Sequence, residues 1–363
     1  MNLNILKLEN DTFTRIAVID YATSIIWVKR FNDVGEFELY IRASSELYDM
    51  FQGDIFITRD DTTTGMIVEK IRLTTDPENG DYLTISGRSV ENIMSWRIIQ
   101  RSVYSQASTT AEMIIRDQVS RQLIYSPVII NPGAIPWVSL GAAQGYTDEV
   151  TRQYTGKPLL DIVRDLCVTF DYGFEFEFTG EKFQFNLYKG TDHSFDQTEN
   201  TLVVFSPEFE NLGNTEYLRD TSNYANGAII GGEGEGNDRV FVWVMPEGVE
   251  GYQRRVIFVD ARNTSSDNGS LTENQYKKML AEQAKEQLEL RKVTTEFNGE
   301  ILNYNAYTYG VDYKLGDKVS IINNYGIQGN AVITEITEVE DENGYKLIPT
   351  LSEWTVVDYE EED

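Results

Sequence analysis

The chain has 363 residues, of which 12% are aromatic, and 59 acidic against 31 basic side chains give it a net charge of −28. This length is enough for roughly two to four domains with cores of their own. The charge argues against stable binding to DNA or to an anionic membrane, because both need a cationic surface. It fits ordinary solubility, and it also fits a surface past which a polyanion moves without adhering.

Cysteine usage and hydropathy narrow the class of protein further. Cys167 is the only cysteine, which excludes an intrachain disulfide and a cysteine zinc cluster. The start, MNLNILKLENDTF, lacks the basic and continuous apolar regions of a signal peptide. No stretch of 18 apolar residues occurs, so we expect no membrane-spanning helix. Synthesis and folding in a cytoplasm are the simplest interpretation.

Residues 1–97 predict one small β domain. Apolar and polar residues alternate through Gly35–Ala43, the pattern of a half-buried strand, and apolar residues also cluster in two strand-like stretches between residues 11 and 30. A short helix is expected after Gly87. We expect a small barrel or a curled sheet here.

A pattern of strand, glycine-bearing loop, strand, Asn-Gly hairpin and strand occurs in Phe51–Ile85 and again in Leu315–Leu351. The corresponding positions are Gly53-Asp54 and Gly316-Asp317, Gly65 and Gly329, Met66–Ile71 and Ala331–Ile336, and Asn79-Gly80 and Asn343-Gly344. Chance spacing of turns in a β-rich protein is the alternative explanation. If the repeat is real, the chain carries two copies of one β unit near its two ends.

Residues 98–200 predict an α+β domain. Ser108–Thr110 is expected to cap one helix, and Pro158 stands at the start of a second whose apolar residues recur at helical spacing up to Phe170. Residues 126–156, rich in proline and glycine, predict a long irregular connection. Alternating aromatic residues on both sides of Thr179-Gly180 then predict a hairpin with one aromatic face, which we interpret as core.

Residues 201–363 predict a second β domain. It would contain an inserted helix at residues 271–292 and end in an acidic tail, Asp358–Asp363. The expected fold is therefore α+β and β-rich, with two similar small barrel-like β domains and α/β domains between them.

Two sequence features invite a site interpretation that their context opposes. The glycine run Gly231–Gly236 could suggest a phosphate-binding loop. Glu233 and Glu235 would repel a phosphate, however, and no helix follows, so we interpret it as a hairpin loop. His193 is the only histidine, and any Ser-His-Asp catalysis would have to use it. It lies in a turn, and no G-x-S-x-G motif is present, which favours a solvent-facing turn residue.

Acidic residues could supply a glycosidase pair, which needs one carboxylate in an apolar setting. Glu175 and Glu177 lie on the polar side of an alternating strand, which favours a solvated face. The acidic turns near Asp76 and Asp341 do not fit a twelve-residue calcium loop. We therefore predict no catalytic, cofactor-binding or metal-binding residues, and no cofactor.

The chain resembles the siphophage and prophage tail-hub family, which includes baseplate hubs and the N-terminal parts of tail-associated lysins. The segments that carry the resemblance are Phe205–Leu212, Tyr217, Asp220, Tyr224–Ala228, Gly231–Gly236, Arg239, the helix and hairpin of Leu159–Gly190, and the β repeat.

The resemblance implies a structural protein at the virion tail tip, made in the host bacterial cytoplasm. It implies a homotrimer whose duplicated β domains form a ring with six similar positions. A tail tube or distal tail protein would lie above the ring, and a fibre, spike or receptor-binding protein below it. DNA would pass without specific binding. Many members continue into a lysin or receptor-binding domain, whereas this chain ends at Asp363, so the expectation is no enzymatic activity.

Two alternatives remain open. One is a receptor- or carbohydrate-binding protein of the tail tip, which would use exposed aromatic residues such as Trp137 or Tyr146. The other is a cell-wall hydrolase, either a glycoside hydrolase or a peptidase.

Overall fold

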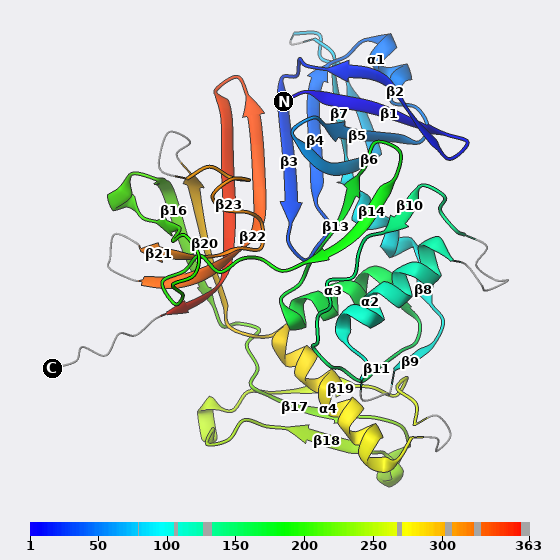
Figure 1. Ribbon diagram of the computed structural model, residues 1–363, viewed down its shortest axis with the longest axis vertical. Coiled ribbons are helices and arrows are strands. Elements are labelled where there is room, and N and C mark those ends of the chain that lie inside the picture. Colours follow the sequence, from blue (N-terminus) through cyan, green and yellow to red (C-terminus); the bar gives the residue numbers. More distant parts are fainter. Residues whose placement is uncertain are drawn as a thin grey trace.

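The computed structural model describes residues 1–78, 80–104, 108–125, 133–266, 271–301, 307–322 and 328–356. A 16-stranded sheet dominates the fold and is accompanied by three small sheets and four α-helices in these ranges. The β-rich class is therefore confirmed. Figure 1 shows two β lobes side by side, with helices below one of them and a helix on a small sheet at the bottom.

The first lobe holds five strands that we call the first β unit. They are β3 (Ser24–Arg30), β4 (Glu36–Arg42), β5 (Ile55–Arg59), β6 (Thr62–Thr74) and β7 (Tyr82–Ser89). They pair in the antiparallel order β5-β6-β7-β4-β3. In β4 the predicted alternation is confirmed, because Phe37, Leu39 and Ile41 are buried. The strands β1 (Leu3–Glu9) and β2 (Thr12–Ile19) and the helix α1 (Ser45–Met50) complete this lobe.

The second lobe contains five strands that we call the second β unit. They are β16 (Leu212–Asp220), β20 (Thr294–Ile301), β21 (Lys318–Ile322), β22 (Gln328–Asp341) and β23 (Gly344–Val356). Their order, β21-β22-β23-β20-β16, repeats that of the first unit strand for strand. The short strand β15 (Val204–Phe205) pairs in parallel with β21.

Local geometry repeats with the strand order. The register between β6 and β7 shifts between Val68 and Lys70, and that between β22 and β23 shifts at the corresponding place, between Ile333 and Glu335. Gly53 and Gly316 both adopt positive φ, 99° and 92°. Asn79 lies outside the described residues, as does the acidic tail. A shared strand order and a shared bulge are not expected from chance turn spacing, so the sequence repeat corresponds to a structural one.

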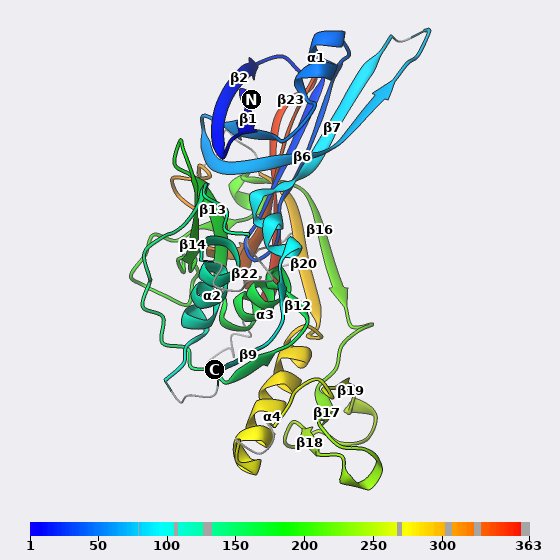
Figure 2. The ribbon, with the colours of Figure 1, turned by 90° about the vertical axis from the view of Figure 1, so that its right-hand side faces the viewer.

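The two units meet where β3 pairs with β22, so their strands belong to one sheet (Figures 1 and 2). Among the described strands, the hydrogen-bonded path is open and runs from β10 at one end to β16 at the other. The expected closed, barrel-like form of each domain is therefore not found in this part of the chain.

The middle region packs beneath the first unit. Its longer elements are α2 (Ala111–Val119), α3 (Leu159–Phe170), β13 (Gly173–Phe178) and β14 (Phe183–Tyr188), and its shorter ones are β8 (Ile98–Ile99), β9 (Ser102–Tyr104), β10 (Val138–Leu140), β11 (Arg152–Tyr154) and β12 (Lys157–Pro158). The predicted cap of α2 is present, because Thr110 accepts the N–H of Met113. The aromatic face of the hairpin is buried as predicted, and it shares one core with Leu6, Phe56 and Ile67 of the first lobe.

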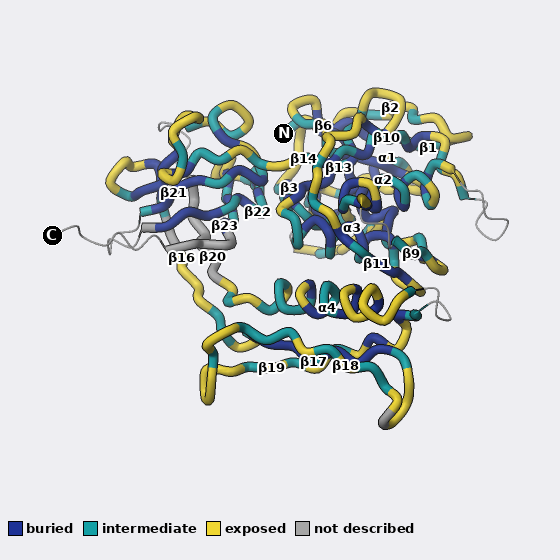
Figure 3. Tube along the Cα trace, turned by 60° about the horizontal axis from the view of Figure 1, so that its bottom comes forward, coloured by how far each residue is buried: buried dark blue, intermediate teal, exposed yellow. Residues whose placement is uncertain are grey.

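A separate layer is inserted into the second unit between β16 and β20. It comprises β17 (Gly227–Gly231), β18 (Phe241–Val244), β19 (Val256–Asp260) and α4 (Glu273–Glu289). The glycine run connects β17 to β18 as a hairpin loop, as predicted. In the capping box of α4, Thr272 and Gln275 are the partners, so the helix begins two residues after its predicted start. Figure 3 shows α4 between this small sheet and the middle region.

Trp27 tests how much β3, the strand of the first unit that pairs with β22, contributes to stability. Its side chain is fully buried, beside Phe37 and under the guanidinium of Arg59. We expect Trp27→Ala to lower the free energy of unfolding by about 3–5 kcal/mol, because it leaves a large cavity. Trp27→Phe should cost clearly less. Urea unfolding midpoints measure both, and equal midpoints for Trp27→Ala and the native chain would contradict the assignment.

Candidate functional site

The seam between the two β units is the first candidate feature. In it, Ser24–Arg30 of β3 pairs antiparallel with Glu335–Asp341 of β22. On one face, Arg30 donates across the seam to Glu335 at 2.6 Å and to Glu36 of β4 at 2.7 Å. These groups are partly exposed, so their ion pairs contribute little to stability and act mainly on register.

The other face of the seam holds a buried ion cluster centred on Glu338. Arg59 donates to Glu338 at 2.8 Å, the Tyr345 hydroxyl donates to it at 2.9 Å, and the Lys29 ammonium lies 3.4 Å away. Arg59 also donates to Asp61 at 2.8 Å. The cluster therefore joins β3 and β5 of the first unit to β22 and β23 of the second.

The pKa values of this cluster follow from burial and pairing. Burial acts to raise the pKa of Glu338, but the charge of Lys29 and the hydrogen bond from Arg59 outweigh it, and the pKa lies below its ordinary value. The hydrogen bond from Arg59 likewise holds the pKa of Asp61 below its ordinary value. Both carboxylates therefore stay charged at neutral pH.

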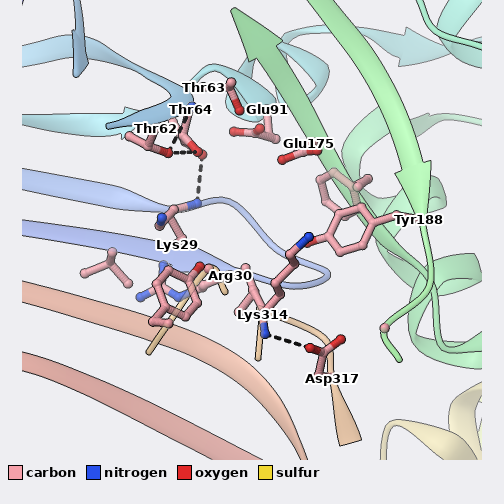
Figure 4. A pocket seen from close by; sticks show the side chains of 18 of the residues that line it. Lys29, Arg30, Thr62, Thr63, Thr64, Glu91, Glu175, Tyr188, Lys314 and Asp317 are labelled. Atoms are coloured by element: carbon pink, nitrogen blue, oxygen red, sulfur yellow. Dashed lines mark hydrogen bonds between the residues drawn. The ribbon is translucent and has the colours of Figure 1, made fainter. Parts of the chain in front are cut away.

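A cavity of about 580 Å³ lies beside the seam and is lined by both β units and the middle region. Figure 4 shows Lys29 and Arg30 on one wall, Thr62, Thr63 and Thr64 on a second, and Glu91, Glu175 and Tyr188 on a third. Lys314 and Asp317, in the segment that leads into β21 of the second unit, also line it. The cavity is thus a junction of the three parts of the chain.

Two acidic residues meet at this cavity, Glu175 from β13 of the middle region and Glu91 from the turn of helix that follows β7. Burial raises the pKa of Glu175 to about 7, and the nearby carboxylates of Glu91 and Glu177 act in the same direction. Burial also raises the pKa of Glu91, which accepts the N–H of Phe176 at 2.7 Å. Glu175 is half-buried and lines the cavity, so this face of β13 is less solvated than its alternating pattern predicts.

A carboxyl with a raised pKa beside a second carboxyl is an arrangement that can transfer protons. Burial of two carboxyl groups where three parts of a chain meet raises their pKa values in the same way without any catalytic role. Sequence reasoning missed Glu91, since nothing in its local pattern indicates that residues of β13 come to lie beside it.

Asp317 fixes the point where the middle region joins the second unit. It accepts the N–H groups of Thr191 at 2.7 Å and of Lys314 at 2.6 Å. Gly190 lies so close to Gly316 that a Cβ on it would be 1.8 Å from the Gly316 carbonyl oxygen. The Gly-Asp pair of the repeat therefore has a role in the second unit that the exposed Asp54 does not have in the first.

The remaining sequence candidates occupy structural positions. The ring of His193 is half-buried, with Nδ1 2.7 Å from the Thr201 carbonyl and Nε2 3.6 Å from Asp317, so the expectation of a solvent-facing residue was wrong. Cys167 is buried, and burial raises its pKa. Trp137, expected to be exposed in a glycan-binding protein, is buried in the core of the middle region, and Tyr146 is half-buried.

Within the described ranges, no group of three or more His, Cys, Asp or Glu side chains is arranged to hold a metal ion. No helix in those ranges is both long enough and apolar enough to cross a membrane.

Comparison with known proteins gives one family. The family model described as "Siphovirus ReqiPepy6 Gp37-like protein" matches residues 4–351. No curated protein sequence matches significantly.

Solved structures share the fold over nearly the whole chain. The tail protein from Neisseria meningitidis MC58 has a TM-score of 0.57 and 12% identity, with 97% of this chain and 96% of that chain covered. The 43 kDa tail protein of prophage MuSo2 from Shewanella oneidensis has a TM-score of 0.56 and 11% identity, with 97% and 98% covered. Prophage tail protein gp18 from Listeria monocytogenes EGD-e has a TM-score of 0.53 and 12% identity, with 97% and 94% covered. At such identities the likeness establishes the fold.

The buried ion cluster leads to a stability prediction. Glu338→Gln removes the carboxylate that Arg59 shares with Lys29 and leaves buried Arg59 with Asp61 alone, so it should lower the free energy of unfolding at pH 7 by about 3 kcal/mol. Glu335→Gln, on the same strand but partly exposed, should cost about 0–1 kcal/mol.

The native cluster should also weaken in acid. Glu338 and Asp61 have lowered pKa values, so their contribution is present above the ordinary carboxyl range and is lost as the pH falls through the folded values. Urea midpoints between pH 7 and pH 3 measure this loss. Equal effects of the two glutamine variants at pH 7 would contradict the cluster.

Glu175 should have the opposite pH dependence. Its folded pKa of about 7 exceeds the unfolded value, so its favourable contribution is complete in acid and is lost as the pH rises through 7. We expect Glu175→Gln to raise stability at pH 8 by about 1–3 kcal/mol and to have little effect at pH 4. Glu177→Gln on the same strand controls for the loss of one charge. A pH-independent effect of Glu175→Gln on the thermal midpoint would refute the assignment.

Proposed function

The chain belongs to the Siphovirus ReqiPepy6 Gp37-like family, and from this premise we propose that it is a structural tail-tip hub protein of a phage or prophage. The observation that carries the proposal is the pair of β units with one strand order, joined edge to edge within one sheet. A protein that presents two like units is suited to forming a ring in which three chains supply six similar positions.

Such a ring would join a sixfold tail tube or distal tail protein on one side to a threefold fibre, spike or receptor-binding protein on the other. Residues 1–97 and 201–363 would supply the ring-forming parts, and residues 98–200 would hold them together. The net charge of −28 supports a pore through which DNA passes without adhering, because like charges repel phosphate.

The proposed role is structural and includes no catalysis. The cavity that holds Glu175 and Glu91 would then serve as a junction, since its walls come from all three parts of the chain. The hydrolase alternative would require turnover of cell-wall material that Glu175→Gln abolishes.

One observation favours the alternative of a receptor- or carbohydrate-binding protein. Aromatic side chains are exposed on the inserted layer, including Phe241 (40%), Trp243 (65%) and Phe258 (57%). Aromatic faces of this kind can stack on sugar rings. This alternative now depends on the inserted layer, because Trp137 is buried.

The hub proposal predicts a trimer. Light scattering on the purified chain, alone and after co-expression with tail-tube proteins, should give three times the chain mass. Negative-stain images should show threefold rings with a central pore. A chain that stays monomeric in both preparations, yet binds glycans and loses that binding in Trp243→Ala, would favour the receptor-binding alternative instead.

A further inference from the structure

The cavity beside the seam contains two carboxyl groups that no described residue neutralises. Glu91 is 4% exposed, and its Oε2 has no hydrogen-bond partner among the described residues. The half-buried carboxylate of Glu175 has no hydrogen bond or ion pair with a described residue either. An ionised carboxylate away from water is costly unless it is paired. The two groups therefore need either protons or a cation.

The backbone nearby accounts for one oxygen of Glu91 and leaves the other unused. The strand β13 pairs with β14 along one edge, but on the other edge it meets β6 only where Glu177 lies opposite Thr64. Next to that point, Oε1 of Glu91 accepts the N–H of Phe176 at 2.7 Å. Ser89 also lies against this carboxyl group. These contacts hold Glu91 in place without engaging its Oε2.

The two carboxyl groups lie close together in the cavity wall. Phe176, whose N–H binds Glu91, is the residue that follows Glu175 in the chain. The charges of the two carboxyl groups interact. Figure 4 shows both groups directed into the same part of the cavity, and Thr63 and Thr64 contribute to the adjoining wall. Several oxygen atoms thus face one small volume.

The other acidic residues that line the cavity all have partners. Asp33 pairs with Arg164, Asp61 pairs with Arg59, and Asp317 accepts two backbone N–H groups. The Glu91–Glu175 pair is therefore the exception within the described part of the lining.

The basic residues of the lining do not neutralise this pair. Four of them line the cavity, and three are held by carboxylates elsewhere. These ion pairs are Lys29 with Glu338, Arg30 with Glu335 and Glu36, and Lys189 with Asp148. The fourth, Lys314, is exposed and has no ion pair with a described residue, and Figure 4 shows its side chain beside Tyr188.

We propose that Glu91 and Glu175 together bind a divalent cation, and that this cation is hydrated Mg²⁺. Carboxylate and hydroxyl oxygens suit hard cations, whereas the described lining holds no histidine or cysteine for zinc. Mg²⁺ is commonly held by one or two carboxylates and keeps several of its waters, while Ca²⁺ takes about six to eight oxygen ligands. A cavity of about 580 Å³ with two carboxyl groups has room for those waters.

A cation at this place would join two parts of the chain. Glu91 follows β7 of the first β unit, and Glu175 belongs to β13 of the middle region. A ligand that binds only the folded state stabilises it by mass action, so Mg²⁺ should strengthen this junction. The proposal concerns a contact within one chain and goes beyond the proposed function, on which it does not depend.

Titration calorimetry tests the site directly. The full chain, treated with a chelator and then titrated with MgCl₂ at pH 8 and constant ionic strength, should bind one Mg²⁺ with a Kd of about 0.1–1 mM, as in weak oxygen-ligand sites. Glu175→Gln should weaken binding at least about tenfold, because it removes one of two charged ligands. Glu177→Gln removes the same charge from the same strand, where Glu177 accepts from Asn186, and should leave the Kd unchanged.

Thermal unfolding gives a second measurement. Mg²⁺ at about ten times its Kd should raise the thermal midpoints of the native chain and of Glu177→Gln, but not that of Glu175→Gln. Glu91→Gln keeps an acceptor for the Phe176 N–H and should likewise lose the Mg²⁺ effect. Because Glu175→Gln is expected to be more stable than the native chain at pH 8, misfolding does not explain a lost response.

The possible outcomes separate the site from its alternatives. Mg²⁺ binding that is equal in the native chain, Glu175→Gln and Glu177→Gln would place the ion on the acidic surface and overturn the proposal. No binding at all would also overturn it, and would mean that the pair carries protons only. Tighter binding of Ca²⁺ than of Mg²⁺, lost in Glu175→Gln, would keep the site and overturn the assignment to Mg²⁺. None of these results bears on whether the chain forms a trimer.

Discussion

The antiparallel pairing of β3 with β22 is the contact on which the rest of the structure depends. It makes one sheet out of two lobes that lie far apart in sequence, and a buried ion cluster locks it. Arg59 and Glu338 are almost fully buried, and the desolvation of such charges is tolerated only when each has its partner. The cluster therefore specifies the relative position of the two β units more than it adds to net stability.

Because the two β units are fixed relative to each other, the duplication gives the molecule a defined arrangement of two like parts. Two copies of a β unit on a flexible linker could take many relative positions, and neither would present a defined edge. When β3 and β22 are joined, the second unit lies at a definite place relative to the first. The middle region strengthens this arrangement, because Asp317 binds the backbone of Thr191 and Gly190 packs against Gly316. A heterologous interface needs this rigidity, since small errors in angle accumulate around a ring.

Local signals in the sequence were sufficient for much of the fold. The hairpins, the cap of α2, the apolar face of α3 and the Gly-Asp turns at Gly53 and Gly316 all depend on neighbouring residues, and all were predictable. The correspondence of β3 with β16 was not, because the inserted layer separates β16 from β20 while only a short loop joins β3 to β4.

The site depends on contacts that no local pattern contains. As a charged residue in a stretch of β22 where polar and apolar residues alternate, Glu338 looks like a solvent-facing residue. It is buried because it pairs with Arg59, which lies 279 residues away in the sequence. Glu175 was placed on a solvated strand face because the cavity beside β13 is formed by residues from three regions. Trp137 stands in a proline- and glycine-rich connection yet is buried, because an irregular segment can fill a core as well as a regular one can.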